Sequence, residues 1–352
     1  MRRTPREFGK TFSGQAAELC RLTTANGLEA DVTDYGATLV SLRYPDQNGK
    51  IRDLVLGYDS VLGYETGSCY FGATVGRNAN RIRGAVFDLN GQEYHLSANE
   101  GRNNLHSGPN GYSFRLWQIR EAEQKENAIT FHLSSPDGDQ GFPGNLEASV
   151  TYELTGDGAL KIHYEAVSDQ STLINMTNHG YFNLNGHDSG NVLNQWMELE
   201  AEYYTPVCAS SALPTGEIRE VAGTPFDFRR PKKIGQEIED GDVQIDRAGG
   251  YDHNFVIDGV SGALRKAASA FSEESGIAME VWTDLPCVQF YTANFVEGQK
   301  GKEGAVYGKR SGFCLETQYF PNSINTPGFP VFVLQPGKRW EATTIYRFYH
   351  MA

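Results

Sequence analysis

A histidine beside a glycine, His179 in the segment TNHGYFNL (residues 177–184), has the residue type that proton transfer needs. Histidine is the side chain whose charge changes near neutral pH. Gly180 tolerates backbone conformations that other residues avoid, so we expect a turn there that brings the chain close to whatever His179 addresses. A lone histidine among polar residues on a strand is more often a hydrogen-bonded structural residue than a catalyst. The functional interpretation therefore depends on what else the chain brings near His179.

Other polar side chains that could form a site stand at the ends of predicted strands. They are Asn80 and Arg81 in GRNANRI (76–82), His106 in LHSG (105–108), Asp252 in GYDHNF (250–255), Gln289 in VQFYT (288–292) and Glu316 in CLETQ (314–318). Each alone has a simpler explanation: Arg81 as a surface strand residue, Glu316 as a structural carboxylate, Asp252 as a turn residue. Spacing along the sequence does not show whether they converge.

Motifs for several common chemistries are missing from the sequence. It contains no GxGxxG opening a helix, no GxxxxGK[ST], no HExxH and no GxSxG. No group of histidines and cysteines has metal-ligand spacing. We therefore expect chemistry carried by acids, bases and hydrogen bonds, with no metal and no cofactor.

Most of the chain that must position these residues reads as strands. Asn48-Gly49 and Asn90-Gly91 each separate two alternating segments, and Asn-Gly accepts the positive φ angles of a type I′ hairpin turn. Residues 146–154 and 160–166 alternate apolar and polar side chains on either side of a turn, which predicts an antiparallel hairpin with one solvated face. Further strands are expected at 28–42 (interrupted at Gly36), 51–56, 85–89, 92–96, 277–283, 288–293, 331–334 and 342–349.

For four other histidines the sequence does not indicate a functional role. His163 falls on the polar face of the segment 160–166, so we expect it to be solvated. His95, His132 and His187 are interpreted in the same way.

Helical signals are sparse. Short helices are expected at 231–238, where a proline stands near the start, and at 58–64. The linker-like segments 209–225 and 239–250 are too short and too mixed in composition to mark a domain boundary. We therefore predict an all-β protein of long antiparallel sheets packed face to face, in a single domain over 1–352, with residues 1–10 as a possible loose N-terminal extension.

Composition limits the partners. The 352 residues carry a net charge of −13, which disfavours phosphate backbones and anionic lipid, so neither nucleic acid nor membrane is expected as a partner. No apolar segment approaches the roughly 20 residues that span a bilayer. The five cysteines include no CxxC pair and are odd in number. All five are expected to be free, as in the reducing cytoplasm.

Six motifs together make the sequence resemble the aldose 1-epimerase (galactose mutarotase) family. The resemblance runs from about Phe8 to Phe348 and rests on GRxxNRI, LHxG, TNHxYFNL, YDHNF, VQFYT and LETQ, in the family's order. It implies a large antiparallel β-sandwich of the galactose mutarotase type, the supersandwich. It also implies Glu316 as general base, His179 as general acid, and a sugar held by Asn80, Arg81, His106, Tyr181, Asp252 and Gln289. Gly180 and Ser107 stand where relatives often carry Ser and Gly, and Asn322 where they often carry Asp.

The implied reaction suits these residue types. Interconversion of the α and β anomers of D-galactose or D-glucose removes the proton of the C1 hydroxyl and protonates the ring oxygen; closure of the open aldehyde reverses both transfers. A carboxylate and an imidazolium can do this, each contributing about 10²–10⁴-fold. Arg81 and His106 could stabilise charge at the ring oxygen. A bell-shaped pH dependence is expected, with His179 responsible for the alkaline limb.

Two alternatives stay open beside this interpretation. One is a non-catalytic sugar-binding module of the same fold. The other is a mutarotase-like enzyme for hexose 6-phosphates, with Arg77 and Arg83 as candidate phosphate-binding cations. The sequence distinguishes neither galactose from glucose nor a monomer from a homodimer.

Overall fold

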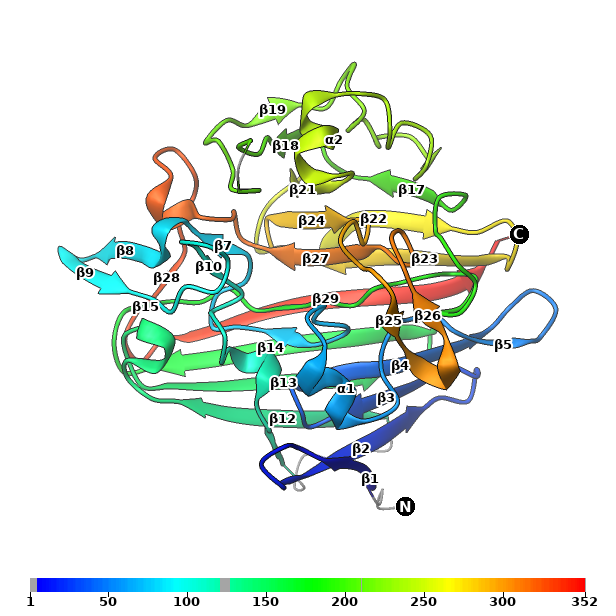
Figure 1. Ribbon diagram of the computed structural model, residues 1–352, viewed down its shortest axis with the longest axis horizontal. Coiled ribbons are helices and arrows are strands. Elements are labelled where there is room, and N and C mark those ends of the chain that lie inside the picture. Colours follow the sequence, from blue (N-terminus) through cyan, green and yellow to red (C-terminus); the bar gives the residue numbers. More distant parts are fainter. Residues whose placement is uncertain (1–4, 121–126, 210, 352) are drawn as a thin grey trace.

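Nine antiparallel strands form the largest sheet in the computed structural model, which describes residues 5–120, 127–209 and 211–351 (Figure 1). The C-terminal strand β29 lies in the middle of this sheet and pairs with β14 and β23. In spatial order the strands are β11 (Gln118–Ile119), β12 (Ala128–Ser135), β13 (Leu146–Leu154), β14 (Ala159–Ser168), β29 (Arg339–His350), β23 (Ile277–Thr283), β22 (Arg265–Phe271), β17 (Trp196–Leu199) and β20 (Lys232–Lys233).

Two five-stranded antiparallel sheets accompany the large one. The N-terminal sheet contains β1 (Arg6–Lys10), β2 (Ala16–Thr23), β3 (Glu29–Thr33), β4 (Thr38–Pro45) and β5 (Ile51–Asp53). The other, which we call the site sheet, contains β19 (Arg219–Glu220), β18 (Tyr203–Thr205), β21 (Asp252–Val256), β24 (Cys287–Tyr291) and β27 (Cys314–Gln318).

Short elements complete the fold. The two-stranded pairs are β6 (Thr74–Val75) with β16 (Thr177–Asn178), β7 (Arg81–Ile82) with β10 (Asn104–Leu105), β8 (Val86–Leu89) with β9 (Gln92–His95), β15 (Thr172–Leu173) with β28 (Val333–Leu334), and β25 (Gln299–Lys300) with β26 (Val306–Tyr307). The helices are α1 (Val61–Thr66), α2 (Val243–Ala248) and the 3₁₀ turns η1 (Arg83–Ala85), η2 (Tyr112–Phe114), η4 (Asp139–Gly141), η5 (Lys302–Gly304) and η6 (Ser323–Asn325). Within the described residues, none of these helices has the length and apolar character that crossing a membrane requires.

The facing surfaces of the three sheets share one cluster of buried apolar side chains. Val150 on β13, Val32 on β3, and Phe290 and Leu315 of the site sheet all belong to it. The hydroxyl of Tyr346 on β29 donates a hydrogen bond to the carbonyl oxygen of Leu315 at 3.1 Å, which joins the large sheet to the site sheet. The predicted all-β sandwich is therefore confirmed. A single domain remains a prediction, in keeping with this shared core.

The strand predictions that rested on clear patterns are confirmed. Residues 146–154 form β13 with strictly alternating burial, and β13 pairs with β14 from Leu146 with Ser168 to Leu154 with Leu160. The Asn90-Gly91 turn joins β8 to β9, and Asn48-Gly49 joins β4 to β5.

The helix predictions are less accurate. Residues 231–238 are not helical: Lys232 and Lys233 pair with β17 as the edge strand of the large sheet, where Pro231 precedes them. The helix expected at 58–64 is α1, which begins three residues later. Helix α2 lies in the segment read as a linker, and its Asp242 side chain accepts a hydrogen bond from the backbone N–H of Gln244.

Three local expectations are corrected. Arg6–Lys10 pair with β2, so this part of 1–10 is no loose extension; residues 1–4 lie outside the described residues. His187 is buried in a turn rather than solvated on a strand, and its Nδ1 lies 2.9 Å from the hydroxyl of Tyr307 on β26. Gly180 does not have a positive φ; a Cβ there would lie 3.1 Å from both Asn178 and Phe182, so lack of space explains the glycine.

Candidate active site

The register of three neighbouring strands places three predicted side chains, together with Tyr291, on one face of the site sheet. Gln289 on β24 stands opposite Glu316 on β27, and Asp252 on β21 stands opposite Tyr291 on β24. Because side chains alternate along a strand, these residues point away from the core that Phe290 and its neighbours fill. The site is thus the outer face of a sheet whose inner face anchors it.

All eight residues predicted from the sequence line one cavity of about 250 Å³. This is slightly below the roughly 300–1,000 Å³ typical of ligand pockets, a size that fits a small ligand. The site sheet supplies three of them and the remainder come from loops and short strands: Asn80, Arg81, His106, His179, Tyr181, Asp252, Gln289 and Glu316.

The carboxylate of Glu316 is buried at the cavity wall. The residue is 3% exposed, and its Oε2 atom has no hydrogen-bond partner among the described residues. Burial raises the pKa of Glu316 to about 8; the charge of Asp252 acts in the same direction and that of Arg81 opposes it. Such a carboxylate is a strong base once ionised, and its free oxygen is available to a ligand.

His179 faces Glu316 across 3.7 Å, measured from Nε2 to Oε1. Its backbone is fixed by hydrogen bonds from its N–H to the carbonyl of Ala73 and from the N–H of Gly72 to its own carbonyl, each 2.9 Å. Burial lowers the pKa of His179 to about 4, and its own backbone carbonyl opposes this shift. The resting imidazole is therefore neutral at pH 7 and, when protonated, is a strong acid.

Two tyrosines hold the plane of the His179 ring. The ring of Tyr181 lies 5.0 Å from it at an interplanar angle of 14°, and that of Tyr70 lies 5.8 Å away at 15°. Both are stacked geometries for π systems. On the other side of the ring, Nδ1 lies 3.6 Å from Sγ of Cys314.

The second histidine, His106, is held in one tautomer. Its Nδ1 accepts a hydrogen bond from the backbone N–H of Asn80 at 3.2 Å. A peptide N–H can only donate, so the proton of the neutral His106 ring is on Nε2. Burial lowers the pKa of His106 well below its usual value, with contributions from the charges of His179 and Arg81, so the ring stays neutral. His106 thus offers a fixed N–H donor.

The loops that carry these residues contain unusual backbone angles. Four of their residues have positive φ angles: 57° at Tyr70, 60° at Asn80, 51° at His106 and 68° at Ser107. Residues other than glycine rarely adopt this region, and such strain gathers at functional sites. The Oγ atom of Ser107 accepts from the N–H of Asn78 at 2.7 Å, which helps to hold a serine at a position where glycine would fit without strain.

Arg81 is fixed by a residue that sequence reasoning missed. Its guanidinium donates to Glu100 through Nε at 2.8 Å and Nη2 at 2.7 Å, a bidentate geometry. Burial lowers the pKa of Arg81, but Glu100 and the charge of Asp252 outweigh this, and the net shift is upward. Among the described residues that line the cavity, Arg81 is the only lysine or arginine.

Hydrogen bonds also orient the acceptors of the site. The amide of Gln289 donates to Asp252 at 2.7 Å, and Gln318 donates in turn to Gln289 at 3.1 Å and to Asn254 at 2.8 Å. Burial raises the pKa of Asp252, while Arg81 and Gln289 oppose the shift. This connected set can hold hydroxyl groups in fixed positions.

Further lining residues had weak signals in the sequence or none. Tyr291 shares a strand face with Gln289, so alternation within VQFYT could have identified it. Glu100 and Tyr70 stand outside any regular pattern, and only the fold brings them to the cavity. The lining residues missed are Ser68, Cys69, Tyr70, Glu100, Leu105, Tyr291, Phe295 and Val296.

Three groups of the site could together resemble a metal centre. One ligand atom each from His106, His179 and Glu316 lie within 4.8 Å of one another. A metal-binding histidine normally donates its other N–H to an acceptor. The Nδ1 of His106 instead faces the donor N–H of Asn80, which keeps the proton on Nε2 and disfavours ligation there. These residues are therefore better suited to hydrogen bonding than to metal binding.

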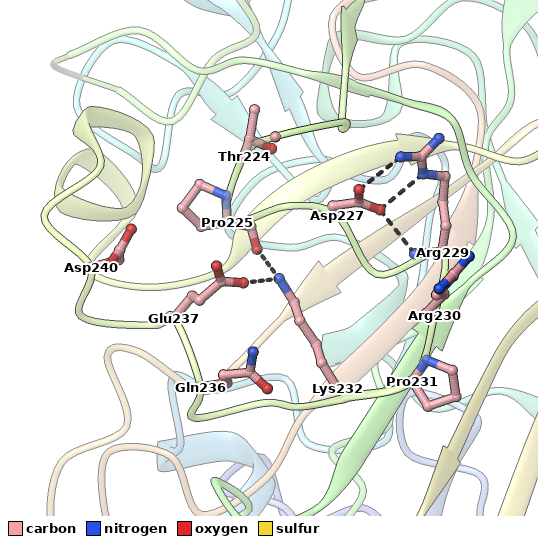
Figure 2. A pocket seen from close by; sticks show the side chains of 11 residues that line it. Thr224, Pro225, Asp227, Arg229, Arg230, Pro231, Lys232, Gln236, Glu237 and Asp240 are labelled. Atoms are coloured by element: carbon pink, nitrogen blue, oxygen red, sulfur yellow. Dashed lines mark hydrogen bonds and ion pairs between the residues drawn. The ribbon is translucent and has the colours of Figure 1, made fainter.

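A larger hollow, about 730 Å³, lies beside β20 (Figure 2). Four of its charged side chains already have partners: Arg229 pairs with Asp227 at 2.7 Å, and Nζ of Lys232 contacts Glu237 and donates to the carbonyl oxygen of Pro225. Of the described residues that line it, none is a histidine or cysteine. We place the site in the smaller cavity, which contains buried ionisable groups.

The two arginines considered as phosphate ligands lie elsewhere. Arg77 is 1% exposed and donates to the carbonyl of Pro143 at 2.7 Å and to Oγ of Ser135 at 2.7 Å. Arg83 donates to the carbonyl of Pro214 at 3.3 Å. Neither lines the cavity.

The chain is similar to proteins of one known family over most of its length. Residues 18–347 match the model of the family described as aldose 1-epimerase. The chain is 42% identical to the galactose mutarotase of Homo sapiens over 342 residues, 97% of each chain. It is 38% identical to the aldose 1-epimerase of Escherichia coli (strain K12) over 337 residues, 95% of this chain and 96% of the other.

Solved structures give the same result. The aldose epimerase homologue from C. elegans superposes with a TM-score of 0.88 at 32% identity, covering 96% of this chain and 100% of the other. The galactose 1-epimerase from Lactobacillus acidophilus superposes with a TM-score of 0.85 at 28% identity, covering 99% of each. The chain belongs to the aldose 1-epimerase family.

Proposed function

We propose that the protein interconverts the α and β anomers of free D-galactose and D-glucose, with Glu316 as base and His179 as acid. The observation that carries the proposal is the buried pair itself, with 3.7 Å between Nε2 of His179 and Oε1 of Glu316. Hydrogen-bonding side chains suited to sugar hydroxyls surround it, among them Arg81, Asp252 and Gln289. Such side chains discriminate between hydroxyl configurations.

Ring opening moves two protons and breaks one bond. The Glu316 carboxylate takes the proton of the C1 hydroxyl, the C1–O5 bond breaks, and Nε2 of the His179 imidazolium gives its proton to O5. The products are the open aldehyde, a neutral carboxyl group and a neutral imidazole. After rotation about C1–C2, the C5 hydroxyl attacks the other face of the aldehyde and both protons return. At the end of the cycle, Glu316 and His179 have returned to their starting protonation states.

Burial of the pair supports this direction of proton transfer. It raises the pKa of Glu316 to about 8 and lowers that of His179 to about 4, so both groups are most stable when uncharged. The reactive ion pair of carboxylate and imidazolium has the same total number of protons as the uncharged pair. Ring opening converts the ion pair to the uncharged pair, which favours bond cleavage. His106 supplies a fixed N–H donor that can contact a sugar oxygen without changing its own protonation.

The two alternatives lose support. Binding of a hexose 6-phosphate would require a second cation in addition to Arg81. Arg77 and Arg83 do not supply it, because they donate hydrogen bonds to Pro143 and Pro214 outside the cavity. A binding module would have no need for two buried groups with opposed pKa shifts. A cytoplasmic location fits the five free cysteines, four of them buried.

Polarimetry tests the proposal directly. Fresh α-D-galactose, α-D-glucose and α-D-glucose 6-phosphate are dissolved separately with and without the protein, and optical rotation is followed. We expect catalysed decay for both free sugars and a much smaller effect on the phosphate. Decay at the uncatalysed rate for both free sugars, together with measurable galactose binding, would favour the binding module.

A further inference from the structure

A thiol lies against the catalytic imidazole on the side away from Glu316. Sγ of Cys314 is 3.6 Å from Nδ1 of His179, while Oε1 of Glu316 is 3.7 Å from Nε2. Cys314 and Glu316 are two residues apart on β27, so their side chains share one face of the strand. A single strand therefore contacts both nitrogens of the ring.

The chemistry of this contact is unusual for a catalytic histidine. In many enzymes the far nitrogen donates to a carboxylate, which orients the ring and stabilises the imidazolium. Burial raises the pKa of the Cys314 thiol well above its usual value, and the charge of Glu316 adds to this, so the sulfur stays uncharged. A neutral thiol is only a weak donor and a weak acceptor. It can orient the ring without strongly stabilising the charged form.

The other groups around the ring do not replace a carboxylate at Nδ1. The backbone carbonyl of His179 weakly favours the protonated ring. The described titratable side chains that face the ring are Glu316 and Cys314 on β27, Tyr291 on β24, and His106, Tyr70 and Tyr181 from the loops.

We propose that Cys314 is a positioning residue for the reaction: its sulfur aims Nε2 of His179 at the reacting sugar, and its weak hydrogen bonding leaves the imidazolium ready to give up its proton. The inference deepens the proposed function, on which it rests. The prediction that distinguishes it from a purely structural role is a change in the pKa of His179 when the thiol is replaced by a hydroxyl in Cys314→Ser.

Cys287 provides a matched control on the adjacent strand. Like Cys314 it is 0% exposed, and burial raises its pKa to about 12. It lies opposite Gln318 at the far end of β24 from Tyr291, where it packs with Phe320 and Phe329. Substitutions at Cys287 therefore measure the cost of changing a buried thiol in this sheet.

The test compares Cys314→Ser and Cys314→Ala with Cys287→Ser and Cys287→Ala. For each variant the pH dependence of kcat and kcat/KM on galactose is measured, and the imidazole of His179 is titrated by ¹⁵N NMR, with His179→Gln assigning its signals. Because a hydroxyl accepts hydrogen bonds better than a thiol, Cys314→Ser should raise the pKa of His179 and move the acid limb of kcat/KM to higher pH. Its kcat should stay within a few-fold of wild type.

Cys314→Ala removes the contact, so kcat should fall about tenfold or more while KM changes little, in line with the large cost of misplacing a catalytic group. Both Cys287 variants should keep the wild-type profile. Wild-type kcat and pH profile in Cys314→Ala would overturn the proposal. If Cys314→Ala does not fold, the test rests on Cys314→Ser. A pKa of His179 that is the same in Cys314→Ser as in wild type would then contradict the inference. Because the NMR titration needs no turnover, it also separates this inference from failure of the proposed function.

Discussion

Nε2 of His179 and Oε1 of Glu316 lie 3.7 Å apart, and both side chains are almost fully buried. Two ionisable groups at this distance titrate as a pair, and the apparent pKa values belong to the pair. Between pH about 4 and about 8 the pair contains one exchangeable proton, which rests mainly on Glu316. The sequence led us to expect that the alkaline limb belongs to His179; the pKa shifts of the pair lead us to predict instead that it reports loss of this shared proton.

The pH dependence of kcat/KM should therefore be bell-shaped. Activity should rise as the pair loses its second proton near pH 4 and fall as it loses the last one near pH 8. The measurement is initial polarimetric rates with galactose across this range, corrected for uncatalysed mutarotation. A rate that keeps increasing well above the upper value would mean that the shared proton is not needed.

Replacing the buried carboxylate should stabilise the ligand-free protein. The pKa of Glu316 is raised from 4.5 to about 8, so between these values the folded state binds more protons than the unfolded state, and stability falls as pH rises. Glu316→Gln removes this penalty. Its free energy of unfolding relative to wild type should increase by on the order of 1 kcal/mol per pH unit within this window.

Urea denaturation at about pH 5 and about pH 7.5 measures the effect within the linkage window. Glu341→Gln, at an exposed position on β29, serves as control for replacing a glutamate elsewhere in the fold. An equal stability difference between Glu316→Gln and wild type at both pH values would contradict the raised pKa.

The two histidines should respond differently to substitution. His179→Gln cannot transfer a proton and should lower kcat by about 10²-fold or more. His106→Gln keeps an N–H donor in place of the fixed Nε2–H group and should retain much more of the turnover, with a change in KM. Steady-state kinetics of both variants at one pH is sufficient. A larger loss of kcat in His106→Gln than in His179→Gln would reverse the roles.

Glu100 should act through Arg81. Glu100→Gln breaks the bidentate ion pair, so the guanidinium loses its fixed orientation and KM for galactose should rise several-fold with a smaller change in kcat. Glu217→Gln is the matched control, because Glu217 forms a similar pair with Arg219 at the surface. Equal kinetics in both variants would show that Glu100 has no part in binding.

The sequence predicts the parts of this molecule that depend on local patterns. The alternation of apolar and polar side chains predicted β13 and β14, because a strand with one buried face needs an apolar residue at every second position. The Asn-Gly pairs predicted two hairpins, because the turn needs residues that accept positive φ angles. The motif-based resemblance supplied all eight candidate residues of the cavity. Local patterns failed where tertiary context decides, as at Lys232, which pairs as an edge strand despite a helix-like sequence.

Contacts between distant segments were beyond sequence reasoning. The pairing of Glu100 with Arg81 and the contact of Cys314 with His179 join loops and strands whose proximity only the packed sheets determine. The opposed pKa shifts of His179 and Glu316 likewise depend on burial, which the residue types alone do not fix.

The role of Glu316 as the base is tested most directly by measuring galactose binding and turnover in Glu316→Gln. The glutamine keeps the size of the side chain and its hydrogen bonding to the anomeric hydroxyl but cannot accept the proton. Methyl galactoside, whose C1 oxygen has no proton to give, measures occupancy of the site by calorimetry without reaction. We expect near wild-type affinity for the galactoside and a fall in kcat on the order of 10²-fold or more. Loss of binding and turnover together, or turnover close to wild type, would contradict the assignment of Glu316 as the base.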